Sequence, residues 1–401
     1  MRGVINKTNG KILGSIIKMN RLHKNMSQKA LAGDICVGSY LSRIENGEIL
    51  PSEQVIAQLF TALEIAYNDD EVFLSEGTRL IDRFLEELNI NEFETSSRIF
   101  SEIDQQSERF RHSPLIIDYY IARLAYYCTT HYRDTFEETS NLLESVIDLM
   151  TYTQKFRYFL YRGIDQIQVA RDTKRAYSFL TEAKGADENG HLWYWLGYLY
   201  LIETNAVKAF ECFTIALQYY LSEANLLSIM GTYEMMGLVY AAENHYEEAK
   251  LYFDKGHKIA EKLGLSSYIR NFENHVLWLD FRGHKMDRIL KTVVSNVPFT
   301  GYSIPGPITK VLAGLAVGNR EEAEACSKML IEIGSYDASY TAALVKDFDF
   351  QAGLPKSEII PTDLLKSESV LMRQYAKEVL VQFFKAHRRY KEVAELLEKD
   401  N

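Results

Sequence analysis

The chain has 401 residues, of which 47% are hydrophobic and 25% charged, and this composition is that of a globular protein rather than of a disordered one. A single hydrophobic core rarely grows to this length, so we expect two or three structural units. The sequence shows no charged-then-apolar leader and no apolar run of about 18 residues, which predicts a protein that is neither secreted nor inserted in a membrane.

The four cysteines lie far apart in the chain, so no pair has the spacing of a metal site or of a redox motif. We therefore expect a protein of the reducing cytoplasm, with no metal and no cofactor. The cysteines are Cys36, Cys128, Cys212 and Cys326.

The net charge of −10 is distributed unevenly. Residues 1–66 hold eight Lys or Arg against five Asp or Glu, a net charge of +3, so the remainder carries −13. No acidic residue occurs among the first 29. A positive field concentrated in this way favours contact with nucleic acid phosphates, and the acidic remainder should keep non-specific binding low.

Two short helices are predicted in the basic region. Ser27 is a good N-cap for the first, which should bury Ala30 and Leu31 on one face. Gly33 and Asp34 then interrupt it. The second is predicted over residues 37–46, and Gly47 should provide its left-handed stop.

The second helix is amphipathic. Val37, Leu41 and Ile44 recur at i, i+4 and i+7 and are predicted to form its buried stripe, while the opposite face is small and polar. Two short helices joined by a tight turn, with such an exposed face on the second, are typical of a helix-turn-helix whose second helix enters the major groove of DNA.

Helices on both sides should complete this small domain. Ile12, Leu13, Ile16 and Ile17 form an apolar stripe before the first short helix, and we expect Lys11, Lys18 and Arg21 to be free to face the DNA backbone. After Pro51 and Ser52 a further helix should close the core with Val55, Ile56, Leu59, Phe60 and Leu63. A solvated surface charge is an equally good interpretation of Lys11 and Lys18.

The segment resembles the Cro/repressor-like (XRE) helix-turn-helix over residues 8–67. The resemblance is carried by Ser27-Gln28, Leu31-Ala32 and the pattern from Ser42 to Gly47. Gly38 departs from it, because Ser is commoner there and Gly costs about 1 kcal/mol of helix propensity. The residues predicted to contact DNA are Ser27, Gln28, Lys29, Gly38, Ser39, Tyr40, Ser42, Arg43 and Asn46.

An internal repeat follows, in aromatic-rich, acidic helices from about Tyr67. Two copies match the tetratricopeptide pattern at a spacing of 40 residues, in which Gly and Ala let paired helices approach and large residues fill the space between pairs. The first copy contains Trp193, Leu196, Gly197, Tyr200, Ala209, Phe213 and Ala216, and the second Tyr233, Met236, Gly237, Tyr240, Ala249 and Phe253.

Weaker copies flank these two. Ala176, Leu180 and Ala183 are typical of an earlier second helix, residues 268–278 of a later first helix, and Tyr390 with Val393 of a last repeat. We therefore predict an all-α protein: a five-helix XRE-type domain over residues 1–67, then a right-handed α-solenoid of tetratricopeptide-like repeats over residues 68–401. The prolines and glycines near residues 296–308 indicate either an ordinary connection or a joint.

This architecture resembles the RRNPP family of Gram-positive regulators, which sense short secreted peptides that re-enter the cytoplasm. The resemblance implies a homodimeric quorum-sensing transcription regulator that binds double-stranded operator DNA and is switched by a peptide in the concave face of its repeats. Asparagines on inner helices commonly hold the peptide backbone in such receptors, since an amide both donates and accepts. Asn271 and Asn274 are the candidates for that role. By repeat phase, the residues that should also face the groove are Tyr194, Tyr198, Glu234 and Leu238. Arg270 is a candidate to pair with a peptide carboxylate, and a surface salt bridge is an equally good interpretation of it.

Little in the sequence points to catalysis. The nine histidines are scattered, with no metal-binding spacing and no glycine-rich phosphate loop, so we predict a protein that is not an enzyme. Two alternatives remain: a repressor released by a protein partner, and a bifunctional regulator that also binds or dephosphorylates a response regulator, for which Gln105 or Gln106 is a candidate to position water.

Overall fold

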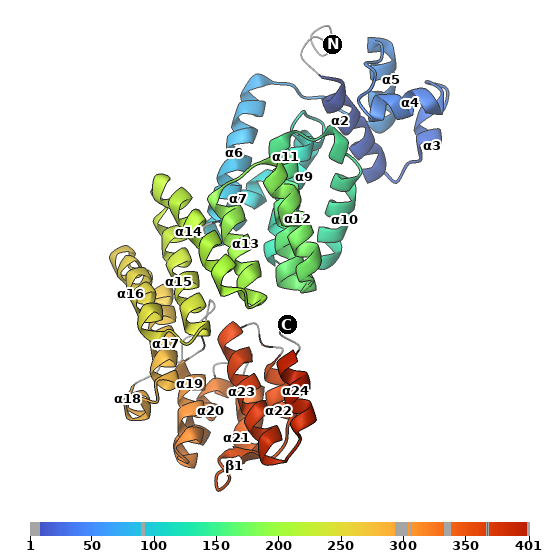
Figure 1. The fold of residues 1–401 in the computed structure, drawn as a ribbon. Coiled ribbons are helices and arrows are strands. Elements are labelled where there is room, and N and C mark those ends of the chain that lie inside the picture. The colour runs from blue at the N-terminus through green and yellow to red at the C-terminus, as the bar shows by residue number, and fades with distance from the viewer. Residues whose placement is uncertain are drawn as a thin grey trace. The chain divides into compact units, whose positions relative to one another are not determined.

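The computed structural model describes residues 9–89, 93–130, 132–292, 304, 306–332, 338–365, 367 and 369–398. The chain divides into two compact units, residues 1–195 and 196–401, each of which is described by itself. Both units are built from helices, as predicted, and the described residues contain one short two-stranded hairpin (Figure 1). Residues 296–303 and 305, most of the predicted joint, lie outside the described part.

Four of the five helices predicted for the DNA-binding segment lie in the described residues. They are α2 (Gly10–His23), α3 (Gln28–Ala32), α4 (Gly38–Glu45) and α5 (Glu53–Leu63). Ser27 caps α3 by accepting from the Ala30 amide, as its hydroxyl predicts, and Gly33 ends the helix at φ +41°. Gly47, at φ +69°, follows α4 in a Schellman arrangement in which the amides of Gly47 and Glu48 donate to the carbonyls of Ile44 and Arg43.

Two predictions about the core of this segment are wrong. Val37 is 68% exposed, because it is the extended N-cap of α4 and not a member of the helix. Ala30 is exposed as well, and Ala32 is buried beside Leu31 in its place. The remaining apolar pattern holds, since the buried side chains include Leu13, Ile16, Ile17, Leu41, Ile44, Ile56, Leu59, Phe60 and Leu63.

A close approach of backbones sets the position of α4 on α2. A Cβ atom added to Gly14 would lie 2.6 Å from the carbonyl oxygen of Ile44 and 2.9 Å from that of Glu45. No side chain fits at that distance, so the glycine lets the end of α4 rest directly on α2.

The rest of the first unit is a stack of helices onto which α2 is docked. The Asn20 side-chain amide donates to the carbonyl of Arg111 at 2.9 Å, and the Lys18 ammonium donates to that of Ser145 at 2.5 Å. The elements are α6 (Glu71–Asn89), α7 (Phe93–Gln105), α8 (Ser107–Arg111), α9 (Ile116–Thr130), α10 (Arg133–Glu144), η1 (Ile147–Leu149), α11 (Tyr152–Asp165), η2 (Gln166–Ala170), α12 (Thr173–Ala186) and α13 (Gly190–Ile202), whose last residues begin the second unit.

The second unit continues with paired antiparallel helices (Figure 1). Its elements are α14 (Ala206–Ser222), α15 (Leu226–Ala242), α16 (Tyr246–Leu263), α17 (Ser266–Arg282), α18 (Met286–Lys291), α19 (Gly306–Ala316), α20 (Arg320–Glu332), α21 (Ala338–Asp347), β1 (Phe348–Asp349), β2 (Leu354–Pro355), α22 (Ile359–Leu364), α23 (Val370–Ala386) and α24 (Tyr390–Glu398). The two strands are antiparallel, with Phe348 opposite Pro355.

The helical repeat is confirmed in the turns and in the packing. Residues with left-handed φ end successive helices at intervals of 20 residues, namely Thr204, Ala224, Asn244, Gly264 and His284. Within the two pairs predicted from sequence, a Cβ atom on Gly197 would lie 2.7 Å from the ring of Phe213, and one on Gly237 would lie 2.4 Å from that of Phe253. The aromatic ring of the second helix thus occupies the space that the glycine of the first leaves.

The weaker copies are helices in the expected places. Ala176, Leu180 and Ala183 are buried on α12, and residues 268–278 lie within α17. Tyr390 and Val393 lie on α24, which packs on α23. Among the described residues, none of the helices is long and apolar enough to cross a membrane.

Candidate DNA interface and ligand sites

The exposed side of the helix-turn-helix is formed by small, polar and basic residues. Ser27, Lys29, Ser39, Arg43 and Asn46 are exposed, and Tyr40 and Ser42 are half-buried. Nothing lies within 4 Å of a Cβ atom placed on Gly38, which is the first helical residue of α4 and not an interior one. A glycine at the helix start weakens α4 less than the interior position assumed from the sequence.

Arg43 is held only loosely. Its Nε atom lies 3.3 Å from Oε2 of Glu48, and both side chains are more than half exposed. Ion pairs of this kind contribute little to stability because water screens them, so a phosphate or a base edge can replace Glu48 as the partner of Arg43.

A buried ion pair connects α2, α3 and α4. The Arg21 guanidinium donates to both carboxylate oxygens of Glu45, from Nε at 2.6 Å and Nη2 at 2.9 Å, and it also donates to the carbonyl of Met26 at 2.7 Å. The Gln28 amide donates to the same carboxylate at 2.8 Å. Glu45 on α4 is fully buried, and its carboxylate joins Arg21 on α2 to Gln28 on α3.

The hydrogen bonds of this domain correct the predictions for Arg21 and Lys18 and bear on the prediction for Gln28. Arg21 is not free to face the DNA backbone, because its charge is buried on Glu45. Lys18 is not free either, because it donates to the carbonyl of Ser145, whereas Lys11 is exposed. The role of Gln28 in DNA contact stays a prediction, with one amide hydrogen already donated to Glu45.

The predicted peptide-contacting residues of the second unit lie on three helices. Tyr198 is on α13, Glu234 and Leu238 are on α15, and Arg270, Asn271 and Asn274 are on α17. Tyr194 belongs to the first unit. Glu234, Leu238 and Asn271 are buried, and Tyr198, Arg270 and Asn274 are half-buried. Peptide contact by each of them stays a prediction.

Sequence reasoning missed a buried partner of Glu234. The ring of His275 donates from Nε2 to Oε1 of Glu234 at 2.8 Å and stacks on Phe253 with 4.4 Å between ring centroids. Within the described part of the chain, Nδ1 of His275 is buried without a hydrogen-bond partner. Asn271 lies one turn before His275 on α17, so the two residues share a face of that helix.

Asn274 already has a structural partner. Its side-chain oxygen accepts a hydrogen bond from the Gly306 amide at 3.1 Å, at the first residue of α19. The side chain therefore satisfies one of the free amides at the start of that helix. A ligand that contacts this oxygen has to share it with α19.

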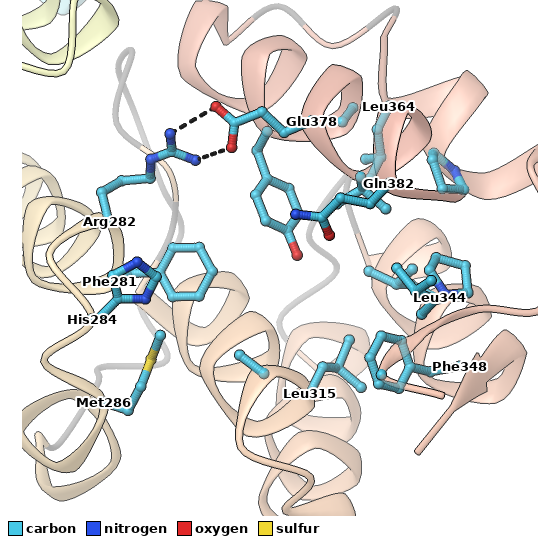
Figure 2. Close-up of a pocket in the computed structure, with 18 of the residues that line it drawn as sticks. Phe281, Arg282, His284, Met286, Leu315, Leu344, Phe348, Leu364, Glu378 and Gln382 are labelled. Carbon is cyan, nitrogen blue, oxygen red and sulfur yellow. Dashed lines mark hydrogen bonds and ion pairs between the residues drawn. The ribbon is translucent and has the colours of Figure 1, made fainter. Parts of the chain in front are cut away.

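A cavity of about 440 Å³ lies in the second unit, beside the C-terminal end of α17 (Figure 2). Its walls come from α16, α17, α18, α19, α21, the β1–β2 hairpin, α22 and α23, and they are mostly apolar, with Phe281, Met286, Leu315, Leu344, Phe348 and Leu364 among them. None of the predicted site residues lines it. The sequence carries no signal for this cavity, because its lining residues lie up to 136 positions apart, from Tyr246 to Gln382, and the hairpin interrupts the repeat.

An ion pair crosses one side of the cavity (Figure 2). Arg282 donates to Glu378 through two hydrogen bonds, at 2.6 and 2.7 Å, and it donates further to the hydroxyl of Tyr246 at 3.1 Å and to the side-chain oxygen of Asn244 at 3.2 Å. Four donor–acceptor contacts hold the guanidinium in place, so α17 and α23 are clamped together beside the cavity.

Two glutamines are the candidates to position a catalytic water. Gln105 is the last residue of α7 and donates to the hydroxyl of Ser101, and Gln106, which follows α7, donates to the carbonyl of Glu102. Across the part of the chain that the structure describes, no three His, Cys, Asp or Glu side chains are grouped as metal ligands would be.

The sequence comparison defines the class of the N-terminal segment. Residues 17–68 match the family model of the helix-turn-helix domain, described as "Helix-turn-helix". This range covers the end of α2 and the whole of α3, α4 and α5. No curated protein sequence matches the chain.

Solved structures define the fold of most of the chain. The Rap protein complexed with Competence and Sporulation Factor is 12% identical over 81% of this chain and 96% of its own, with a TM-score of 0.60. NprR in complex with its cognate peptide NprX is 15% identical over 80% of this chain and 99% of its own, with a TM-score of 0.57. The resemblance to the RRNPP family is thereby confirmed at the level of fold: a helix-turn-helix domain is combined with the helical repeats of Rap and NprR.

Proposed function

We propose that the protein is a cytoplasmic quorum-sensing transcription regulator. It binds operator DNA through α4, and a short signalling peptide held on the inner face of its repeats switches that binding. The observation that carries the proposal is the exposed polar face of α4 on a helix-turn-helix, joined to repeats with the fold of two proteins solved with Competence and Sporulation Factor and with a cognate peptide.

The DNA arm of the proposal rests on Arg43 and on the charge of the segment. Residues 1–66 carry a net charge of +3, and Arg43 projects from α4 with only an exposed ion pair to release. We expect Arg43→Ala to weaken binding to the operator by about ten- to hundredfold, since a base contact contributes about 1–3 kcal/mol. Gel-shift titration at fixed salt measures the loss.

Arg175→Ala is the matched control for Arg43→Ala, because Arg175 is also an exposed arginine in an ion pair but lies on α12. The control should bind the operator as the unaltered protein does. Equal affinity of both variants would remove α4 as the reading helix.

The peptide arm rests on Asn271 and its neighbours. Asn271 is buried on α17, one turn from His275, and an asparagine side chain can both donate to and accept from a peptide backbone. We expect Asn271→Ala to weaken peptide binding by about 1–3 kcal/mol, the cost of a lost buried hydrogen bond, without changing operator binding by the free protein. Asn274 is a poorer choice, because its replacement also uncaps α19.

Gln218→Ala is the control for Asn271→Ala, since Gln218 is an exposed amide on α14. Calorimetric titration of both variants separates a specific contact from a general loss of repeat stability. Undiminished affinity in Asn271→Ala would show that the peptide lies on another face.

Footprinting of the chain's own upstream region, with and without peptides from conditioned medium, tests the whole proposal. A protected site with two half-sites, whose protection changes with peptide, is the expected result, and sedimentation should then show a homodimer. Protection of the DNA that is unchanged by every peptide but changes with a co-purified protein would contradict the proposal and favour the antirepressor alternative.

A further inference from the structure

The cavity at the end of α17 has a chemistry of its own. Its apolar wall is formed by side chains such as Phe281, Leu315 and Phe348. Arg282 and Glu378 neutralise each other in a bidentate pair, and His284 is a further polar side chain of the lining. A charged ligand group would be stripped of water against apolar walls, and neither Arg282 nor Glu378 is available to it as a counter-charge. The lining therefore selects an uncharged, apolar occupant.

The cavity also offers hydrogen bonds that the protein does not use. Tyr375 and Gln382, both on α23, line it, and neither the Tyr375 hydroxyl nor the Gln382 side-chain amide has a hydrogen-bond partner among the described residues. Burial raises the pKa of Tyr375 to about 12, so its hydroxyl keeps its proton and can donate as well as accept. A hydroxyl and an amide beside an apolar wall suit one peptide unit together with its apolar side chain.

The position of the cavity on α17 connects it to the predicted peptide face. Arg282 follows Asn271 by 11 residues, which is close to three helical turns, so both lie on nearly the same face, about 16 Å apart along the axis. An extended peptide covers about 3.3 Å per residue and spans that distance with about five residues. A peptide of about five residues is therefore long enough to contact both Asn271 and the cavity.

We propose that this cavity binds an uncharged aromatic or branched aliphatic side chain of the signalling peptide, with the adjoining peptide unit bonded to Tyr375 and Gln382. The inference rests on the proposed function for the identity of the ligand. The β1–β2 hairpin contributes to it as well, because Phe348, Leu354 and Pro355 close the cavity where the helical repeat is interrupted.

The direct test uses defined fragments in place of the unidentified peptide. N-acetyl-phenylalanine amide and N-acetyl-leucine amide should bind the full-length protein in saturation-transfer NMR, and N-acetyl-lysine amide and N-acetyl-glutamate amide should bind at least tenfold more weakly. Equal binding of all four would overturn the charge argument. Ethylbenzene supplies the ring without the peptide unit, and binding as tight as that of the phenylalanine fragment would overturn a peptide as the occupant.

Two variants locate the fragment. Ala316→Trp adds bulk at a residue that lines the cavity, and Val317→Trp adds the same bulk at the next residue, which is exposed and does not line it. The first should abolish binding of the phenylalanine fragment and the second should leave it unchanged. Equal effects of the two would contradict the assignment.

A milder pair of variants covers the case in which Ala316→Trp fails to fold. Tyr375→Phe and Gln382→Ala each remove one hydrogen-bonding group from the lining. Each should weaken the binding of the phenylalanine fragment about threefold or more while leaving the binding of ethylbenzene unchanged. Unaltered fragment binding in both would overturn the proposed contacts. Because these measurements use no DNA, loss of the cavity site and failure of the proposed regulator function give different results: the first abolishes fragment binding, the second abolishes the peptide response in footprinting.

Discussion

Two glutamates are buried in this protein in contrasting surroundings. Glu45, in the helix-turn-helix, receives three hydrogen bonds from Arg21 and Gln28, and its charge is matched by a guanidinium. Glu234, in the repeats, receives one from His275, whose other ring nitrogen is buried without a partner among the described residues. One network is complete and the other is not.

The difference teaches what each region is suited to do. A carboxylate with a full set of donors fixes the relative positions of three helices, and a recognition helix needs that rigidity to present the same face to DNA each time. A buried imidazole nitrogen without a partner costs free energy in the free protein. A ligand that supplies the missing hydrogen bond would recover that cost, which fits the proposed sensor role of the repeats.

The largest effect is expected from breaking the complete network. Glu45→Ala leaves the charge of Arg21 buried and unpaired, and such a loss costs about 3–5 kcal/mol. Urea unfolding of the full chain, with hydrogen exchange to locate the change in α3 and α4, measures it. Glu48→Ala, which removes the exposed partner of Arg43, is the control and should change stability little. Similar losses in both would show that Glu45 is no clamp.

A smaller loss is expected from filling the close contact in the repeat. Gly237→Ala places a methyl group 2.4 Å from the ring of Phe253, and overpacking of this kind costs about 1–3 kcal/mol. Gly231→Ala on the same helix is the matched control, because nothing lies within 4 Å of its Cβ position. It should gain up to about 1 kcal/mol of helix propensity. Thermal unfolding distinguishes the two, and a gain in both would refute the packing argument.

A double-mutant cycle should measure the coupling free energy between Glu234 and His275. Glu234→Leu and His275→Phe each leave the other polar group buried alone, and each should cost about 1–2 kcal/mol. The double variant replaces both groups by apolar ones and should cost less than the two single changes together. Unfolding free energies of the four proteins give the coupling. Strict additivity would mean that the pair does not act as a unit.

The smallest effect concerns pH at the junction between the helix-turn-helix and the following helices. Burial lowers the pKa of the His112 imidazole below 6.5, and its Nδ1 accepts from the Ala66 amide at 3.3 Å, which requires the neutral ring. The folded protein thus disfavours the proton, so this contribution is present above pH 6.5 and is lost as the pH falls through the lower folded pKa.

We expect that loss to be at most about 1 kcal/mol, the net value of one hydrogen bond. Unfolding measured at several pH values should show a shallower dependence in His112→Gln than in the unaltered protein. Parallel curves would assign the pH dependence to other groups.

The parts of the fold that were predicted correctly depend on neighbours in sequence. Ser27 as a cap and Gly47 as a stop act within one helical turn, and Gly237 meets Phe253 at the offset that the repeat pattern specifies. Val37 differs from its prediction because its apolar side chain fits the helical period while its backbone is extended as a cap. Periodicity alone cannot separate these two states.

The missed parts depend on long-range partners. Arg21 looked free because Glu45 lies 24 residues away, and the polar pair Arg282–Glu378 joins residues 96 apart in a part of the chain without a repeat match. The role of His275 is not evident from the sequence, because its partner Glu234 lies 41 residues earlier in the chain. The candidate sites could therefore be predicted as helix faces but not as networks of contacts.

The docking of α2 bears on the spacing between the two half-sites of an operator. Asn20 and Lys18 attach this helix to the carbonyls of Arg111 and Ser145, and the amide of Asn68, just after the domain, donates to the carbonyl of His112. The helix-turn-helix that contains α4 is thus fixed to the following helices of the first unit by hydrogen bonds. In the proposed dimer the distance between half-sites would then be set by the subunit contact, and an operator lengthened by five base pairs, half a turn of the duplex, should no longer be bridged.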